Sequence, residues 1–442
     1  MPKGNADLLI VHAAELIRCA GPRGGIRELD LERLELIADG ALAIGSGRIL
    51  AVGSTEELLR AYTAPRIIHA SGRLVSPSFV DPHSHLVFGG SRHLDYEAKV
   101  TQRRPGRALA GGIGFTARAT STTSDDELIR RALADLDAML VHGTTTLEAK
   151  TGYGVSVEEE LRLLRLTAGL RHTVDVVPTF LALHVLPEDY AGRRDRWIQE
   201  ITDALPEAAG LARYCDVSCD PVCFTFDECL RVGEAARSLG MKIRVHADQT
   251  GDANGAALAA RLAASAADHL DYANPSGLRA LAASGTVATL LPGVALHLCE
   301  LTPGIRDDQL VAAEKPFLPM LVRQAIAAGA VVALSTDYNP GSCPTVSMQV
   351  VMQLAARLFR LGYAEIWNMC TLNAARALDL ADDRGSLEVG KRADVLVWTV
   401  PEHGMVINRF GSNLVDTVIA GGQVVVEAGR IARGEPTRGT AK

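Results

Sequence analysis

The chain has 442 residues, 48% of them hydrophobic and 22% charged, which is ordinary for a globular protein with a large core. This composition excludes a disordered chain, and the net charge of −7 argues against electrostatic binding of nucleic acid. No apolar run is long and uncharged enough for a membrane span or a secretory signal, so we predict a cytoplasmic protein that binds neither nucleic acid nor membranes. The eight cysteines are too sparse for a disulfide framework and are predicted to be reduced, buried thiols.

Both ends of the chain predict short strands joined by tight turns. Gly45-Ser46-Gly47 separates two apolar runs near the N-terminus, and Gly421-Gly422 separates two near the C-terminus. Glycine in such a position is typical of a β-hairpin, because it adopts the positive φ angles of the tightest turns. We expect residues 1–75 and 381–442 to form the two parts of one small β-sandwich domain.

The middle of the chain, residues 76–380, alternates apolar runs with amphipathic segments such as residues 124–143. Strand alternating with helix is the pattern of a parallel sheet, and eight such units over roughly 270 residues match a (β/α)8 TIM barrel. The predicted fold class is therefore α/β, with the sandwich beside the barrel. The predicted barrel strands occupy residues 74–85, 144–152, 174–184, 213–220, 242–249, 266–273, 285–293 and 331–337.

Histidine and aspartate stand at the ends of several of these runs, where a TIM barrel places its reactive side chains. His83 and His85 are two residues apart, so both would point to the same side of a strand. His246 and Asp337 end two further runs. Three imidazoles and a carboxylate suit Zn²⁺ or Fe²⁺ and leave room for a water, whose pKa such a metal lowers toward about 7. The pattern predicts a metal-dependent enzyme that activates water.

Two other histidines also end predicted strands. His269 ends the run that follows that of His246, and it could serve as a further ligand or as a general acid or electrophile. His184 could contact the substrate. Histidines away from the strand ends are predicted to be structural or exposed; they include His12, His69, His142, His172 and His403.

Several segments are similar to those of a known family. They are residues 80–92 (VDPHSHLVFGGSR), 148–154 (EAKTGYG), 246–249 (HADQ), 265–270 (SAADHL) and 334–342 (LSTDYNPGS). On these segments the chain resembles the amidohydrolase superfamily and, within it, the imidazolonepropionase family of histidine breakdown. The resemblance extends over residues 5–430, where NAARAL at 373–378 and GSLEVGKRAD at 385–394 are more general superfamily motifs.

The resemblance implies a single divalent metal, zinc before iron. It also implies that Asp337 accepts the proton of the attacking water and that His269 stabilises the tetrahedral intermediate. The implied metal ligands are His83, His85, His246 and Asp337. The implied substrate contacts are Arg92, Tyr153, His184 and Gln249, to which we add Arg103 and Phe115. Lys150 could be a carbamylated ligand between two metals, as in binuclear relatives, but the resemblance favours one metal.

Segments around the expected substrate differ from the family's usual sequences. They are Gln102-Arg103-Arg104-Pro105, Ala110-Gly-Gly-Ile-Gly-Phe115, Ala182-Leu183-His184 and Asp220. An altered substrate therefore stays open beside the leading one, although the metal ligands are all present.

The leading hypothesis is a homodimeric hydrolase of a small anionic heterocycle. It would open a C–N bond in a five-membered imidazole-derived ring whose propionate tail binds arginine and tyrosine. One alternative is hydrolytic release of sulfide from the 2-thioxo-5-oxo-imidazolidine propionate analogue, and hydantoin propionates are a further substrate class. Another alternative is a heterocycle aminohydrolase, which shares the same ligand pattern. The intact ligands argue against a non-catalytic barrel.

Overall fold

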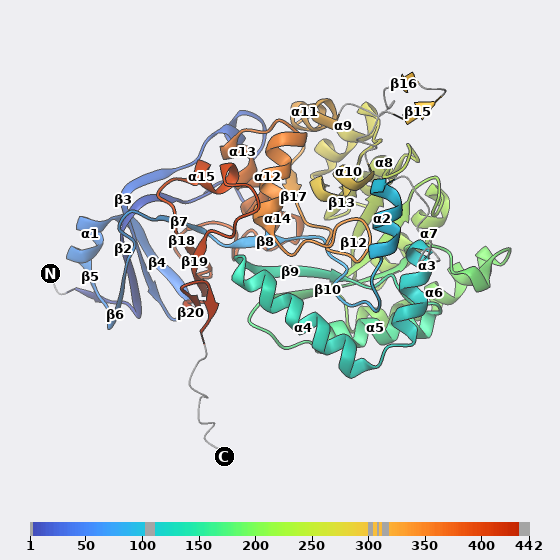
Figure 1. The fold of residues 1–442 in the computed structure, drawn as a ribbon, viewed down its shortest axis with the longest axis horizontal. Helices are drawn as coiled ribbons and strands as arrows, with labels where there is room; N and C mark the ends of the chain where they lie inside the picture. The colour runs from blue at the N-terminus through green and yellow to red at the C-terminus, as the bar shows by residue number, and fades with distance from the viewer. Residues whose placement is uncertain (1–2, 102–110, 299–303, 307–308, 312–317, 433–442) are drawn as a thin grey trace, which may run out of the picture.

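The computed structural model describes residues 3–101, 111–298, 304–306, 309–311 and 318–432. Two β structures organise this part of the chain: an eight-stranded parallel sheet that curves into a nearly closed barrel, and a nine-stranded mixed sheet made from both chain ends. Figure 1 shows the blue and red strands of the mixed sheet beside the barrel and its helices. The predicted α/β fold class is confirmed: the TIM barrel is present, and the two chain ends combine beside it, as one nine-stranded mixed sheet where a small β-sandwich was expected.

The barrel strands follow one another in chain order, each parallel to its neighbours. They are β8 (Phe79–Asp81), β9 (Thr144–Lys150), β10 (Asp175–Leu183), β11 (Tyr214–Cys219), β12 (Lys242–Ala247), β13 (Ala266–His269), β14 (Val287–Leu290) and β17 (Val332–Leu334). The last strand returns to the first, since Ser84 after β8 forms a parallel bridge with Tyr338 after β17. The buried Asp81 carboxylate supports this closure by accepting hydrogen bonds from Ser335 and Thr336.

The first predicted strand divides into two. Its first part, β7 (Leu74–Pro77), pairs with β2 (Leu8–Ile17) and β18 (Val395–Trp398) in the mixed sheet, whereas β8 enters the barrel. The predicted end at His85 is too late: β8 ends at Asp81, because Pro82 has no N–H to donate to a neighbouring strand. The predicted domain boundaries after residues 75 and 380 stay predictions.

The mixed sheet contains the two predicted hairpins. Ser46 and Gly47 connect β3 (Leu36–Gly45) to β4 (Arg48–Ser54), with φ angles of 52° and 74°. Gly421 and Gly422 connect β19 (Val415–Ala420) to β20 (Gln423–Glu427), with φ angles of 54° and 80°. Positive φ at both turn residues matches the twist of antiparallel strands, so both hairpin predictions are confirmed. The sheet also includes β6 (Arg66–His69) and β21 (Arg430–Ile431).

Helices cover the outside of the barrel. In α4 (Asp125–Val141), the Ser124 side chain caps the first turn by accepting from the Glu127 N–H. Apolar residues at helical spacing on α4, which packs against β9, are buried: Leu128, Ala132, Leu136 and Met139.

The other helices are α1 (Thr55–Ala61), α2 (His93–Thr101), α3 (Gly112–Ser121), α5 (Val157–Gly169), α6 (Arg194–Ala209), α7 (Phe226–Ser238), α8 (Gly255–Arg261), α9 (Pro275–Ser284), α10 (Pro292–Leu298), α11 (Leu318–Ala327), α12 (Met348–Leu358), α13 (Tyr363–Cys370), α14 (Leu372–Ala377) and α15 (His403–Asn408). Two short strand pairs complete the elements, β1 (Gly4–Asn5) with β5 (Tyr62–Thr63) and β15 (Gly304–Arg306) with β16 (Gln309–Val311).

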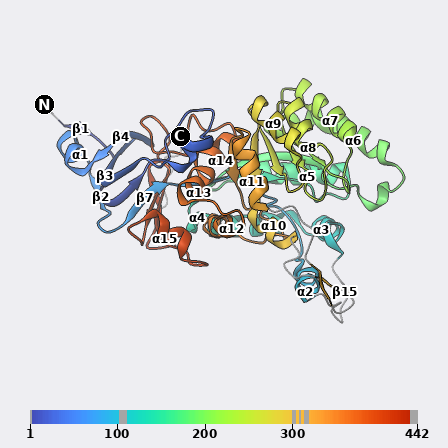
Figure 2. The same ribbon diagram turned by 90° about the horizontal axis from the view of Figure 1, so that it is seen from above.

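Helices α2 and α3 lie near each other beside the barrel, as Figures 1 and 2 show. The Asp95 carboxylate on α2 accepts hydrogen bonds from the N–H groups of Gly111 and Gly112 at the start of α3. These bonds tie the loop that carries Arg92, immediately before α2, to the glycine-rich turn before α3.

Membrane insertion and disulfides were both expected to be absent. None of the described helices combines the length and the apolar character that a membrane span requires. The described cysteines are free, and most of them are buried. Burial raises the pKa of the Cys215 and Cys229 thiols, which keeps them neutral.

Candidate active site

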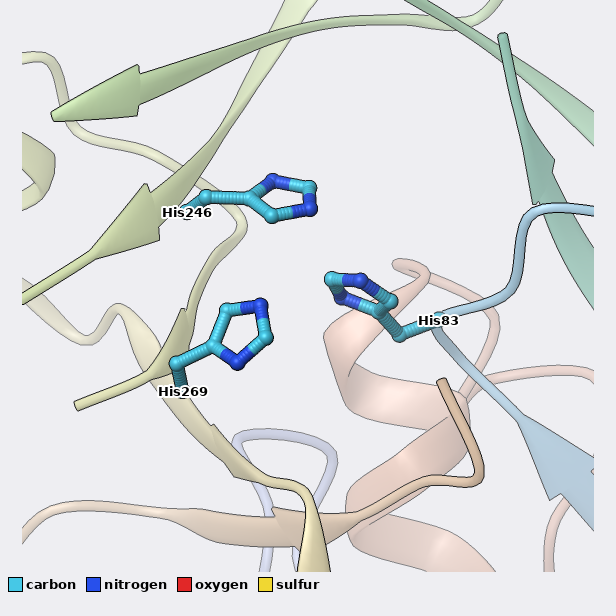
Figure 3. A group of neighbouring side chains, drawn as sticks. All are labelled: His83, His246 and His269. Carbon is cyan, nitrogen blue, oxygen red and sulfur yellow. The ribbon is translucent and has the colours of Figure 1, made fainter. Parts of the chain in front are cut away.

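The side chains predicted to bind metal meet at the carboxyl end of the barrel strands. His83 and His85 follow β8, His246 lies on β12, and Asp337 follows β17. Figure 3 shows the ring of His83 pointing toward those of His246 and His269, which come from the neighbouring strands β12 and β13. Each of these five residues is at most 4% exposed, so the cluster is shielded from bulk water.

The donor atoms of this cluster are close enough to share one cation. Nε2 of His83 and Nε2 of His85 each lie 3.4 Å from Oδ1 of Asp337. Nε2 of His269 lies 3.9 Å from Oδ2 of Asp337, and the ring centroids of His83 and His246 are 4.6 Å apart. Three overlapping groups each place their ligand atoms within 4.8 Å of one another: His83–His85–Asp337, His83–His246–His269 and His85–His184–His246.

Backbone hydrogen bonds between the first and last strands position the two histidines after β8. The Asp337 N–H donates to the His83 carbonyl over 3.0 Å, and the His85 N–H donates to the Tyr338 carbonyl over 2.7 Å. The segment therefore keeps the alternation of a strand beyond the end of β8. His83 and His85 both reach Asp337, in agreement with the side that their spacing predicts.

Carboxylates behind the histidines orient their rings. Nδ1 of His83 lies 2.8 Å from Oδ2 of Asp268, and Nδ1 of His246 lies 3.1 Å from Oδ1 of Asp216. Because an ionised carboxylate only accepts hydrogen bonds, each Nδ1 carries the proton and each Nε2 keeps a free lone pair. Histidines that bind a metal are commonly oriented in this way.

Several buried polar atoms of the cluster have no hydrogen-bond partner in the described part of the chain. They are Nε2 of His83 and His246, both ring nitrogens of His269, and Oδ1 of Asp337. A buried polar atom without a partner costs about 1–3 kcal/mol, so a group of them is unfavourable unless something binds them. Imidazole nitrogen and carboxylate oxygen are ligands for a divalent cation such as zinc. The residues present therefore fit a metal ion.

Burial controls the protonation of the cluster. It is the main cause that lowers the pKa of His83, His85 and His269 well below the ordinary value, and neighbouring imidazoles lower it further. Burial also raises the pKa of Asp337 to about 7, an effect that His246 opposes. A bound cation would favour the ionised carboxylate. Neutral imidazole and ionised carboxylate are the forms in which these groups bind metals.

His269 and Asp337 both have left-handed backbone conformations, with φ angles of 74° and 48°. Residues other than glycine seldom adopt such angles, because the conformation costs free energy. Such angles also occur away from the cluster, for example at Asp379, with a φ angle of 52°. The catalytic roles predicted for His269 and Asp337 therefore rest on the position of these residues at two strand ends of the cluster.

A fully buried ion network lies behind the histidines. Nζ of Lys150 is 2.8 Å from Oε1 of Glu148, 2.6 Å from Oδ2 of Asp216 and 3.5 Å from Oδ2 of Asp268. Arg244 joins the network with Nη2 placed 3.0 Å from Oδ1 of Asp268. Burial acts to lower the pKa of Lys150, but Asp216 and Glu148 outweigh it and raise that pKa. Lys150 is therefore a charged ammonium group, and its contacts disfavour the alternative of a carbamylated ligand.

The predicted substrate contacts Arg92, Tyr153 and His184 lie beside the metal cluster. The His184 ring stacks on that of His85 with 5.1 Å between centroids, and the Tyr153 ring lies 5.5 Å from the same histidine. Burial raises the pKa of Tyr153 and lowers that of His184 to about 4, and the nearby Arg92 guanidinium lowers the pKa of both. A guanidinium, a phenol and an imidazole thus border one side of the cluster.

The remaining predicted contacts are Gln249, Phe115 and Arg103. Gln249 is half-buried in the loop after β12. Phe115 lies on α3, where its ring packs against Gly90 so closely that a Cβ on this glycine would be 3.1 Å from Cε1. Gly90 is two residues before Arg92, so the structure brings Phe115 to the same loop as this arginine. Arg103 lies outside the described residues.

The sequence reasoning missed the groups that support the site. Asp268 contacts His83, and Asp216 contacts His246. Glu160 accepts hydrogen bonds from the N–H groups of Gly152 and Gly154, which lie on either side of Tyr153; the first of these bonds is 2.8 Å long. A signal for the two aspartates existed, because an acidic residue inside a buried strand requires a partner. Glu160 shows no such signal, since it stands among the acidic residues of the first turn of α5.

The sequence of the chain is similar to those of proteins whose family is known. Residues 74–425 match the model of the amidohydrolase family. The chain is 40% identical to an imidazolonepropionase of Symbiobacterium thermophilum, over 97% of this chain and 99% of that protein. It is 37% identical to an imidazolonepropionase of Alkaliphilus metalliredigens, over 96% of this chain and 99% of that protein.

Solved structures share the fold at lower sequence identity. An adenosine deaminase from Xanthomonas campestris with bound zinc has a TM-score of 0.67 and 18% identity, covering 98% of this chain and 96% of that one. A 5-methylcytosine deaminase from Klebsiella pneumoniae liganded with phosphonocytosine has a TM-score of 0.71 and 19% identity, covering 97% of this chain and all (100%) of that one. At these identities the likeness concerns the fold alone. The family match, the full-length relatives and the buried histidine–aspartate cluster show that this chain belongs to the amidohydrolase family.

Proposed function

We propose that this protein is a metal-dependent hydrolase that opens a C–N bond in a five-membered imidazole-derived ring bearing a propionate, as an imidazolonepropionase does. The observation that carries the proposal is the 40% identity to the imidazolonepropionase of Symbiobacterium thermophilum over nearly the whole of both chains. The buried cluster supports it, because its ligand atoms are close together and two of its rings are oriented by carboxylates.

One divalent metal per chain belongs to this proposal, with zinc the first choice and iron the second. His83, His85, His246 and Asp337 would hold it. When bound, such a metal acidifies water and polarises a carbonyl group. The three carboxylates around Lys150 support a single metal, since they occupy the nitrogen that a carbamylated ligand would need.

Asp337 and His269 carry out the proton transfer and the charge stabilisation. The Asp337 carboxylate accepts one proton from the water that adds to the ring carbonyl carbon, and it delivers this proton to the ring nitrogen as the C–N bond breaks. His269 is neutral because of its burial, so one ring nitrogen keeps an N–H. This N–H donates to the oxygen that gains negative charge in the tetrahedral intermediate.

The substrate is bound by its tail and by its ring. Arg92 and Tyr153 donate to the propionate, for which the planar guanidinium offers two parallel N–H donors. His184 and Gln249 bond the polar atoms of the ring. Phe115 and Arg103 are proposed further contacts near the tail.

A panel of imidazolone, thioxo-imidazolidinone and hydantoin propionates, followed by mass spectrometry, tests the proposal. We expect the imidazolone to gain one water as its ring opens. The altered segments that include Phe115 and His184 favour a second candidate, in which the thioxo compound releases sulfide. Sulfide release without turnover of the imidazolone would replace the first proposal by the second. Ammonia release from a heterocycle would indicate an aminohydrolase, and no turnover by metal-loaded protein would contradict all three.

We also propose a homodimer and a cytoplasmic location, both of which rest on the sequence. Sedimentation equilibrium of the purified protein measures the first, and fractionation of cells that produce it measures the second. The chemistry derived above needs neither, because every described site residue comes from one chain.

Active protein is expected to contain about one zinc ion per chain, because the three histidines and the carboxylate form one set of ligands for a single ion. Elemental analysis of purified protein measures the ratio, and dialysis against a chelator should abolish turnover until zinc is restored. Full activity without metal would contradict the assignment. Two ions per chain would restore Lys150 as a bridging ligand.

The substitution Arg92→Lys is expected to raise KM for the propionate about tenfold. A lysine keeps the charge but not the two parallel donors, and a charged hydrogen bond at a shielded site is worth roughly 1.5–3 kcal/mol. Steady-state kinetics measures KM, with Arg130→Lys as the control, since Arg130 is an exposed residue paired with Glu127 on α4. Equal KM values for the propionate and its neutral amide in the unmodified enzyme would show that no arginine binds the tail.

A further inference from the structure

Gly341 lies directly against the guanidinium of Arg92. A Cβ atom on Gly341 would overlap Nη1 and Cζ of Arg92 and would lie 2.8 Å from its Nη2. All three atoms belong to the guanidinium, so the charged end of this arginine occupies the space that a side chain at position 341 would fill. The two residues are far apart in sequence and come from the loops after the last and the first barrel strands.

The loop of Gly341 is fixed to the metal cluster. Oδ1 of Asn339 accepts hydrogen bonds of 2.8 Å from the N–H groups of Gly341 and Ser342, and its Nδ2 donates to the Asp337 carbonyl over 2.7 Å. These bonds use backbone groups and the Asn339 side chain, so a methyl group at position 341 removes none of them. The φ angle of Gly341 is outside the left-handed region, so alanine fits the backbone there without strain.

Arg92 also lies within ion-pair distance of Asp95. Its Nε is 3.5 Å from Oδ2 of Asp95, the carboxylate that also accepts from the Gly112 N–H at the start of α3. Arg92 is also near Tyr153 and His184, whose pKa values it lowers. The guanidinium therefore lies against the fixed loop of Gly341 and near the carboxylate of Asp95, close to the phenol and imidazole of the site.

We propose that Gly341 is a positioning residue for Arg92: the absence of a side chain at 341 places the guanidinium where it binds the substrate's carboxylate. The clash that alanine creates would fall on the end of a flexible side chain, so the arginine moves and the backbone stays in place. The inference rests on the proposed function, because it assigns the carboxylate of that substrate to Arg92.

The test is the substitution Gly341→Ala, studied with the imidazolone propionate and with its neutral carboxamide. We expect KM for the propionate to rise about tenfold, the size of a weakened charged hydrogen bond. The kcat, the KM for the carboxamide and the zinc content should stay near the unmodified values. Gly24→Ala is the matched control, since a Cβ on Gly24 meets nothing within 4 Å.

A double-substitution cycle separates positioning from a general effect on the loop. In an Arg92→Ala background the guanidinium is gone, so adding Gly341→Ala should change KM little further. Additive effects in this cycle, or an unchanged KM in Gly341→Ala, would overturn the inference.

Binding without turnover distinguishes this inference from the proposed function. Calorimetry with imidazole-4-propionate, a stable ring analogue, should show about tenfold weaker binding to Gly341→Ala than to the unmodified protein. If no propionate of the panel is hydrolysed but this difference holds and disappears in the Arg92→Ala background, the proposed function fails and the positioning role stands. If the panel is hydrolysed and Gly341→Ala binds and reacts normally, the positioning role fails and the function stands.

Discussion

Replacing Asp337 by asparagine is expected to lower kcat by about 100-fold or more while the protein stays folded. Asparagine keeps the shape of the side chain but loses the basic oxygen that accepts the proton, and a general base contributes about 10²–10⁴ in rate. The left-handed φ of 48° at this position does not oppose the change, because asparagine tolerates this conformation as aspartate does. Steady-state kinetics on the imidazolone propionate measures the loss.

The metal content of the Asp337→Asn variant has to be measured beside its rate, because the substitution also weakens a ligand. The expected loss of kcat persists when the variant is saturated with zinc. Asp379→Asn is the matched control: Asp379 also has a left-handed φ, of 52°, but it pairs with Lys242 at the start of β12, the opposite end of that strand from the histidines. Near-normal turnover of fully loaded Asp337→Asn would contradict this role and would assign the base to His269.

The barrel and the candidate metal ligands could be predicted because both depend on local sequence pattern. Alternating strand and helix predicts a parallel barrel, and the carboxyl ends of its strands meet at one rim. Residues as distant as His83, His246 and Asp337 could therefore be grouped without any knowledge of their contacts. The hairpin at Gly421-Gly422 could be predicted equally well from the sequence, since its turn type demands residues that tolerate positive φ.

The end of the first barrel strand was misjudged although its cause is local. The run from Leu74 to His85 was predicted as one strand, whereas the structure divides it into β7 and β8 and ends β8 at Asp81. Pro82 marks that end, because proline cannot donate to a strand ladder. The error did not affect the assignment of His83 and His85, since backbone bonds to Asp337 and Tyr338 continue the alternation.

The contacts that support the site could not be predicted, because they join residues through space. Lys150 binds Asp216 and Asp268, and the three residues lie on three different barrel strands. A single sequence does not show which side chains meet inside a barrel. The contact between Arg92 and Gly341 is of the same kind: a glycine in a loop carries no pattern that indicates what lies against it.

The substitution Asp216→Asn is expected to weaken zinc binding by about 10–100-fold, the usual effect of removing a group that orients a metal ligand. Burial acts to raise the pKa of Asp216, but Lys150 and His246 outweigh it and hold that pKa below its ordinary value, so the group is ionised. Its Oδ1 accepts from Nδ1 of His246 over 3.1 Å. Asparagine can still accept this bond, but without the charge that makes the imidazole a stronger ligand, and its amide can turn an N–H toward Nδ1. A zinc titration of the metal-free protein, with activity as the signal, measures the change.

Loss of a buried charge also destabilises the fold, so the control must share that cost. Asp394 is likewise buried and paired, with Oδ1 placed 2.9 Å from Nε of Arg392 and 2.7 Å from the Gly421 nitrogen, but it lies beside the mixed sheet. Asp394→Asn and Asp216→Asn should both lower the thermal midpoint, because each leaves a cationic partner less well compensated. Only Asp216→Asn should shift the zinc titration. At saturating zinc, the kcat of this variant should fall by a much smaller factor than its apparent affinity for zinc. A shift of equal size in both variants would assign the effect to stability, and no shift in Asp216→Asn would show that His246 holds its orientation without the carboxylate.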